Sequence, residues 1–313
     1  MMNRVGFFVL AAALAVAGCK GELDSQAPAV ESSRPLEWRL LLLVETLLDL
    51  EGEEKTTVSA ALFEIGGPFE IPIELRLNAG DSMQASDGVQ TIDLAVSEDD
   101  ETSYEGTFPM PITGQQLTVS LMKGALPVDV DWWVPTDDSP QPDFSEFFFN
   151  ATDMQVQLAE PLTISSPVYV PPDGTNAAVI PEFELGDDVT LEWAPTNSET
   201  ALRLVYQSEC VNLLDPSDTF KTPAGVITIV DDPDDPDAPD DPGELTREVD
   251  VFLTGQPIPA TVDPAGCIIT LTLQRETEAE NVTLAPALSD ENIVVTRYNH
   301  SIQIKSVPAP SND

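Results

Sequence analysis

Short apolar stretches that alternate with polar positions recur along the chain and predict β-strands. In the first half these stretches cover residues 58–65, 71–77, 90–96, 104–108 and 117–122, with Gly, Asn, Asp or Pro between them. The second half repeats the pattern at residues 202–206, 226–230, 249–253, 267–273, 293–298 and 301–307. Asn299 and His300 separate the last two stretches and predict a hairpin turn. We therefore expect an all-β chain built from antiparallel β-sandwiches.

Residues 36–50 fit two patterns. The even-numbered positions from Trp38 to Val44 are all apolar, and this period of two is typical of a strand. Leu, Glu and Arg favour helix, however, and the stretch is apolar on several faces. We interpret residues 36–50 as a strand; a helix here would pack on the sheet and leave the fold class unchanged.

The length of the chain suits two sandwich domains, which we place at residues 36–160 and 161–308, followed by a disordered tail at 309–313. Within the second domain, Val189, Leu191 and Trp193 alternate with polar residues and are expected to face inward. Together with the preceding Ser-Pro and Gly-Asp-Asp, they form a sequence motif that resembles bacterial immunoglobulin-like modules. The likeness covers about thirty residues and implies a fold, with no activity attached.

The amino terminus carries an export pattern. A lone Arg4 and an apolar run too short to span a bilayer precede Val16-Ala17-Gly18-Cys19, which resembles the lipobox of bacterial lipoproteins. The resemblance implies that residues 1–18 are removed and that Cys19 carries a diacylglyceryl group. Residues 19–35 then form a flexible tether. Since Lys20, and not Asp, follows the cysteine, the resemblance favours the outer membrane. The alternative is an ordinary secretion signal with an incidental cysteine.

Charge narrows the choice of partners. The chain has 13 basic and 55 acidic residues, a net charge of −42. Scattered cations on so acidic a chain argue against nucleic-acid binding, and the net charge opposes adhesion of the body to an anionic surface. Acidity of this size is commonly a device for solubility or for a saline environment.

Two cysteines remain after the anchor, Cys210 and Cys267. An exported compartment oxidises thiols, and both cysteines lie on the apolar faces of their predicted strands, so we expect one disulfide between them. The alternative is two buried free thiols. Two cysteines and one histidine lack the close spacing of a metal site, so we expect none of that kind.

An acidic segment at residues 231–244 has a proline at every third position from 233 to 242. This period matches polyproline II and predicts a stiff, solvated spike inserted in the second domain. The weaker alternative is a calcium site at Asp231, Asp232, Asp234 and Asp235, because Ca²⁺ prefers hard oxygen ligands. Regular prolines oppose the bend that such a site needs, and we expect no cofactor beyond the covalent lipid.

Aromatic residues gather between the two predicted domains, notably Trp132, Trp133, Phe144 and Phe147. Aromatics commonly fill the junction of two packed sandwiches, and this is the interpretation we favour. If these rings are exposed, they form a patch suited to stacking on sugars.

No catalytic constellation emerges from the sequence. The segment 80–83, Gly-Asp-Ser-Met, resembles the Gly-Asp-Ser-Leu block of a serine esterase family, but Arg297 stands where that family's Asp would precede His300. We read residues 80–83 as a hairpin turn and His300 as a turn residue. The sequence thus predicts a non-catalytic envelope lipoprotein that binds another envelope or surface protein. The alternative is a carbohydrate-binding accessory protein that uses the 132–149 aromatics.

Overall fold

The computed structural model describes residues 37–65, 72–75, 77, 82–97, 103–122, 152–215, 218–231, 240–253, 262–278 and 293–309. The chain divides into two compact units, Met1–Pro35 and Leu36–Asp313, and every described residue belongs to the second. These residues form strands and one short helix, so the fold is all-β, as predicted. None of the described helical residues forms a span long and apolar enough to cross a membrane.

The strands follow one another in two groups. The first group comprises β1 (Glu37–Leu48), β2 (Glu54–Ile65), β3 (Pro72–Leu75), β4 (Ser82–Ser86), β5 (Thr91–Val96), β6 (Ser103–Thr107), β7 (Gln116–Met122) and β8 (Thr152–Gln157). The second comprises β9 (Thr163–Ser166), β10 (Glu182–Glu184), β11 (Asp188–Ala194), β12 (Ala201–Val211), β13 (Thr219–Lys221), β14 (Gly225–Val230), β15 (Glu244–Glu248), α2 (Val249–Leu253), β16 (Ile268–Glu278) and β17 (Ile293–Val307). Residues 37–48 of the ambiguous stretch 36–50 therefore form a strand, as predicted.

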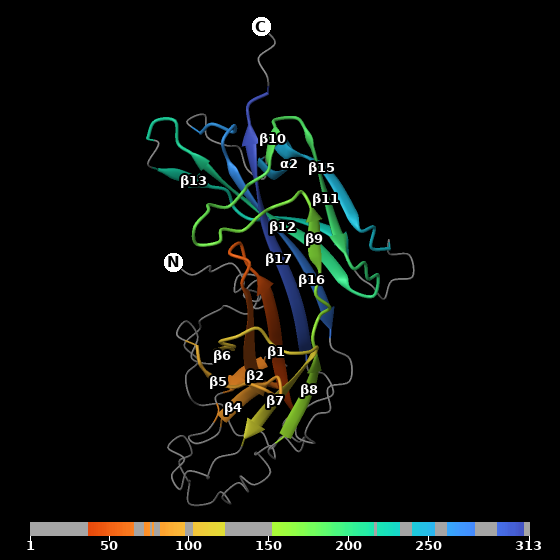
Figure 1. Ribbon diagram of the computed structural model, residues 1–313. Coiled ribbons are helices and arrows are strands. Elements are labelled where there is room, and N and C mark those ends of the chain that lie inside the picture. Colours follow the sequence, from red (N-terminus) through yellow and green to blue (C-terminus); the bar gives the residue numbers. More distant parts are fainter. Residues whose placement is uncertain are drawn as a thin grey trace, which may run out of the picture. The chain divides into compact units, whose positions relative to one another are not determined.

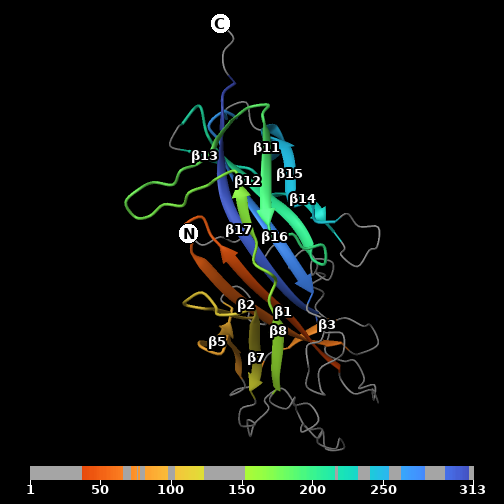
Figure 2. The same ribbon diagram turned by 45° about the vertical axis from the view of Figure 1, so that its right-hand side comes forward.

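Strand β17 lies in the middle of the large sheet, between β16 and β1 (Figure 1, Figure 2). It pairs antiparallel with β16 from Ile268↔Lys305 to Glu278↔Val295. On its other side it pairs in parallel with β1, from Leu41↔Ile293 to Leu48↔His300. The first and last strands of the described chain are thus neighbours, and the large sheet takes strands from both groups.

Two hydrophobic clusters lie along this sheet. The amino-terminal cluster draws on β1, β2 and β4–β8, and the carboxy-terminal cluster on β9, β11, β12, β14, α2, β16 and β17. Strand β17 contributes to both, since Val294 packs in the first cluster while Ile302 and Ile304 pack in the second. The shared strand ties the two clusters together.

The predicted hairpin at Asn299 and His300 is wrong, because both residues lie inside the continuous strand β17. Asn299 pairs with Gln274 of β16 and with Leu47 of β1, so a central strand continues where the sequence suggested a turn. The polar pair resembled a turn because its partners come from strands far away in the sequence.

The strand predicted at residues 249–253 is also wrong, because Val249–Leu253 is the helix α2. Its buried residues are Val249, Phe252 and Leu253, a spacing of three and four that matches one face of a helix. The run is apolar enough for either structure, and its shortness concealed the helical period.

A second, three-stranded sheet has the order β15-β11-β9. Val189, Leu191 and Trp193 of β11 are buried in the carboxy-terminal cluster, which confirms their predicted inward direction. Gly186 has a φ of 88°, so glycine suits the turn before β11. This small sheet brings Trp193 close to the polar network described next.

Candidate functional site

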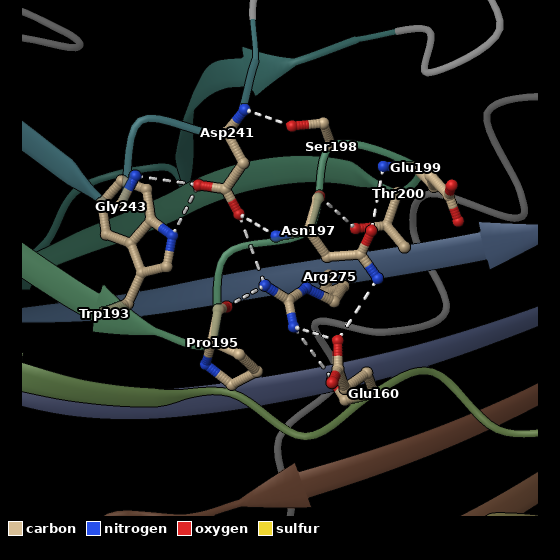
Figure 3. A network of polar contacts seen from close by, with 10 residues as sticks. All are labelled: Glu160, Trp193, Pro195, Asn197, Ser198, Glu199, Thr200, Asp241, Gly243 and Arg275. Atoms are coloured by element: carbon tan, nitrogen blue, oxygen red, sulfur yellow. Dashed lines mark hydrogen bonds and ion pairs between the residues drawn. The ribbon is translucent and has the colours of Figure 1, made fainter.

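A buried polar network surrounds Arg275 on β16 (Figure 3). The side chain of Arg275 is fully buried. Its Nη2 donates to the carbonyl oxygen of Pro195 at 2.6 Å and to Oδ2 of Asp241 at 3.4 Å. Its Nη1 lies 3.5 Å from Oε2 of Glu160, whose side chain is partly exposed. The guanidinium therefore joins three segments that are far apart in the sequence.

Asp241 is equally buried and is nearly saturated with donors. Its Oδ1 accepts from Nε1–H of Trp193 at 2.9 Å and from the backbone N–H of Gly243 at 3.0 Å. Its Oδ2 accepts from the backbone N–H of Asn197 at 2.9 Å, and its own backbone N–H donates to Oγ of Ser198 at 3.1 Å. A carboxylate held by so many donors is a structural anchor.

The positive charge of Arg275 is compensated within this network by two carboxylates. Burial lowers the pKa of Arg275, while Asp241 and Glu160 oppose that shift. Arginine stays charged under such conditions, so the site holds a compensated ion pair. The Nε of Arg275 is buried without a partner among the described atoms, and the remaining donors are occupied. The arrangement suits holding the fold together.

The network corrects part of the predicted acidic spike. We expected residues 231–244 to be solvated throughout, yet Asp241 is buried and Glu244 begins β15. Asp231 is exposed, and residues 232–239, with the calcium candidates Asp232, Asp234 and Asp235, lie outside the described residues. Asp241 can be buried because Arg275, the only described cation of this network, pairs with its carboxylate.

His300 occupies an interior position on β17 instead of the predicted turn. Its Nδ1 accepts a hydrogen bond from the backbone N–H of Ile164 at 3.0 Å, which connects β17 to β9. Burial lowers the pKa of His300, and a backbone hydrogen bond with Leu162 partly opposes this shift. The lowered pKa disfavours the protonated ring. Ser82, the serine of the segment predicted as a hairpin turn, begins strand β4, while residues 80–81 lie outside the described residues.

The odd-numbered residues of β17 carry a row of paired polar groups. Nη2 of Arg297 donates to Oε2 of Glu276 at 2.5 Å. Nδ2 of Asn299 donates to Oε1 of Glu45 at 2.5 Å, and its Oδ1 accepts from Nε2 of Gln274 at 3.1 Å. These groups satisfy one another across β1, β16 and β17, so the row fixes the register of the central strands.

Cys210 and Cys267 form the predicted disulfide, with an S–S distance of 2.02 Å. Both residues are fully buried in the carboxy-terminal cluster. The bond joins the end of β12 to the residue before β16, across a sequence separation of 57.

The other predicted site residues lie outside the described part of the chain. They are the lipidation residue Cys19 and the aromatics Trp132, Trp133, Phe144 and Phe147. Among the residues that are described, no group of three or more His, Cys, Asp or Glu side chains could hold a metal ion.

Sequence reasoning missed the Arg275 network, although a signal was present. Positions 267, 269, 271 and 273 alternate as buried apolar residues, and Arg275 continues the same parity. A cation on the inward face of a strand calls for a buried acid, which is Asp241 here. A scan against protein-family models and a search of curated proteins found no match to this chain.

Proposed function

We propose that this chain is a bacterial envelope lipoprotein that works without catalysis as a structural or protein-interaction module. Acyl chains on Cys19 would hold it to the outer membrane, and its acidic body would face a partner protein in the envelope or at the surface. Two or three acyl chains anchor a protein durably, so no spanning helix is needed.

The disulfide between Cys210 and Cys267 is the observation that carries this proposal. Structural disulfides persist in exported proteins and are rare where glutathione and thioredoxin keep thiols reduced. A buried disulfide agrees with the export pattern that precedes Cys19, and the two features are independent because they lie in different parts of the sequence. Both point to a compartment outside the cytosol.

The absence of catalysis is supported by how the reactive groups are used. His300 accepts a backbone N–H with Nδ1, and Asp241 is enclosed by donors from Trp193, Asn197 and Arg275. A general base needs a free lone pair within reach of substrate. In these described groups, the lone pairs already accept hydrogen bonds that hold the fold together.

We propose further that each hydrophobic cluster is the core of one immunoglobulin-like sandwich. In the second, the sheet β15-β11-β9 contributes Val189, Leu191 and Trp193 to the same cluster as β12, β16 and β17. Two sheets that bury alternate residues against one another are the basis of a sandwich. Since β17 also enters the first cluster, the two proposed sandwiches share a strand.

The anchor is tested by replacing its cysteine in the producing bacterium. Wild-type protein should take up labelled palmitate and sediment with outer-membrane vesicles, whereas Cys19→Ser should do neither. Cys210→Ser is the matched control, because it changes a different cysteine. The folded fraction of this variant should still take up palmitate and sediment with the vesicles. Equal labelling and sedimentation of wild type and Cys19→Ser would contradict the proposal.

A further inference from the structure

Strand β9 contacts both sheets, but in two different ways. With β11 of the small sheet it pairs antiparallel, and the register skips Ser165 between Ile164 and Ser166. Strand β17 of the large sheet pairs with β1, β10 and β16, and β9 is not among its pairing partners in the described part of the chain. Instead, the backbone N–H of Ile164 donates to Nδ1 of His300 at 3.0 Å. One imidazole ring therefore bridges β9 to the large sheet.

This bridge requires a neutral ring. The Nδ1 atom can accept a hydrogen bond only while it carries no proton, and a protonated imidazole is a donor at both nitrogens. Protonation would place an N–H of His300 opposite the N–H of Ile164, at the 3.0 Å separation of the two nitrogens. The contact that holds β9 when the ring is neutral therefore becomes repulsive when the ring is charged.

The elements on one side of His300 provide no free acid that could accept a hydrogen bond from the protonated ring. Residues 161–167, which include β9, carry no charged side chain. The side chains that β11 contributes to the core are apolar. On β16, Leu273 lies opposite His300, and the next residue on that side is Arg275, which pairs with Asp241. A charged ring would therefore lose Ile164 without gaining a new partner from these elements.

The elements on the other side contribute one acid, Glu54 of β2. Leu48 of β1 lies opposite His300, and Glu54 lies opposite Leu48 in the same row. The hydroxyl of Tyr298 on β17 donates to Oε2 of Glu54 at 3.4 Å, so this carboxylate already has a partner. Burial lowers the pKa of His300, and only a backbone hydrogen bond with Leu162 opposes this shift. His300 therefore titrates without a charged partner.

Apart from this bridge, β9 is held by few contacts. It is four residues long, Thr163–Ser166, and Ile164 is its only buried residue. The hydroxyls of Ser165 and Ser166 donate to carbonyl oxygens of β11 at 3.3 Å each. Strand β17, in contrast, is paired along both edges with β1 and β16. Because short edge segments with few buried contacts open at lower free energy than central strands, β9 is the element that yields when the bridge is lost.

We propose that His300 is a pH-operated latch for β9. The neutral ring holds β9 closed on the carboxy-terminal cluster, and the protonated ring releases it while β1, β16 and β17 stay paired. Opening uncovers Leu162 and Ile164, which are exposed by only 1% and 7% in the closed form, and frees the edge of β11 at Trp193. The latch needs neither a lipid anchor nor a partner protein, so it is independent of the proposed function.

The direction of the response follows from the two states of the ring. In the closed form burial lowers the pKa of His300, whereas a ring freed from β9 returns toward the ordinary value of about 6.5. The open form therefore binds the proton more readily, and acid favours it. Between pH 7.5 and pH 5.0, the ratio of open to closed β9 should rise by about tenfold or more, with an upper limit of roughly thirtyfold.

The test compares hydrogen exchange of β9 with the titration of the ring in the full-length protein, purified without a histidine tag. His300 is the only histidine of the chain, so its ring signals in NMR spectra report its protonation directly. Between pH 7.5 and pH 5.0, the protection factors of residues 163–166 should fall by about tenfold or more, with the midpoint of the ring titration. Strand β15, the other edge strand of the same small sheet, is the internal control and should keep its protection.

Two variants separate His300 from other titrating groups. His300→Asn and His300→Gln keep a side-chain acceptor that cannot be protonated at these pH values, so β9 should keep the same protection at both. The same loss in either folded variant as in wild type would overturn the latch. Titration of the ring in wild type without a change in β9, or no titration of the ring down to pH 4, would also overturn it. Equal loss of protection in β9 and β15 would indicate general unfolding and would overturn the local release.

Discussion

Arg275 brings a positive charge into the carboxy-terminal cluster, where its side chain is fully buried. Such a charge is tolerated only when an acid and further hydrogen bonds compensate for the lost hydration. Asp241 supplies the acid, and the carbonyl of Pro195 supplies a strong acceptor at 2.6 Å. The loss of one partner should therefore cost more than the loss of both.

Asp241→Ala should lower the free energy of unfolding by about 3–5 kcal/mol, because it leaves the Arg275 charge buried without its acid. Urea denaturation measures this directly. Combining it with Arg275→Met should recover a large part of the loss. Asp240→Ala, which removes the exposed neighbouring acid, is the control and should change little. A loss below about 1 kcal/mol for Asp241→Ala would show that the pair is not a structural anchor.

His300 should make stability depend on pH. Since burial lowers its pKa in the folded state, the unfolded chain binds the extra proton more readily. The contribution is complete above the ordinary histidine pKa of about 6.5 and is lost as the pH falls through the lowered value. His300→Asn keeps a side-chain acceptor for the backbone N–H of Ile164. In urea unfolding, this variant should lose less free energy of unfolding than wild type between pH 7.5 and pH 5.5. An identical pH dependence in both proteins would contradict it.

The sequence was most informative where alternation was regular. Cys210, Cys267 and Trp193 were assigned to buried faces by parity, and the structure confirms all three. Arg275 follows the same parity, but a charged residue is not expected in a core. Its partner Asp241 belongs to a segment that was predicted to be solvated. The parity of Arg275 indicates a buried cation, but the sequence does not say which distant acid pairs with it.

At the scale of elements, the disulfide closes a loop with a sequence separation of 57 between β12 and β16. By the chain-entropy relation, the double variant Cys210→Ala, Cys267→Ala should lose roughly 4 kcal/mol of stability. Urea unfolding of the oxidised protein and of the variant gives the comparison. Wild type treated with dithiothreitol in denaturant should behave like the variant, and equal midpoints for all three would refute a structural role for the bond.

Other elements escaped prediction for identifiable reasons. Strand β8 has the sequence Thr-Asp-Met-Gln-Val-Gln, in which only Met154 and Val156 are apolar and buried. Helix α2 is only five residues long, so its apolar spacing resembled a strand. The hairpin at Asn299 and His300 was inferred from local polarity, whereas pairing with β1 and β16 decides the conformation there.

At the scale of the whole described body, the β1–β17 pairing makes the two hydrophobic clusters interdependent. Residues 36–160 expressed alone would lack β17 and its buried Val294, and residues 161–313 alone would expose the edge of β17 that pairs with β1. We expect neither fragment to give a cooperative thermal transition, while the whole mature chain gives one. Two independent transitions, each reproduced by a fragment, would contradict this expectation.

The central claim, an exported, lipid-anchored and oxidised protein, is tested most directly by the intact mass of the protein isolated from its native envelope. The account predicts a chain that begins at Cys19, carries the mass of two or three acyl chains, and is two hydrogens lighter than its reduced form because Cys210 and Cys267 are bonded. A chain that retains Met1, or one with an unmodified Cys19 and two free thiols, would contradict it.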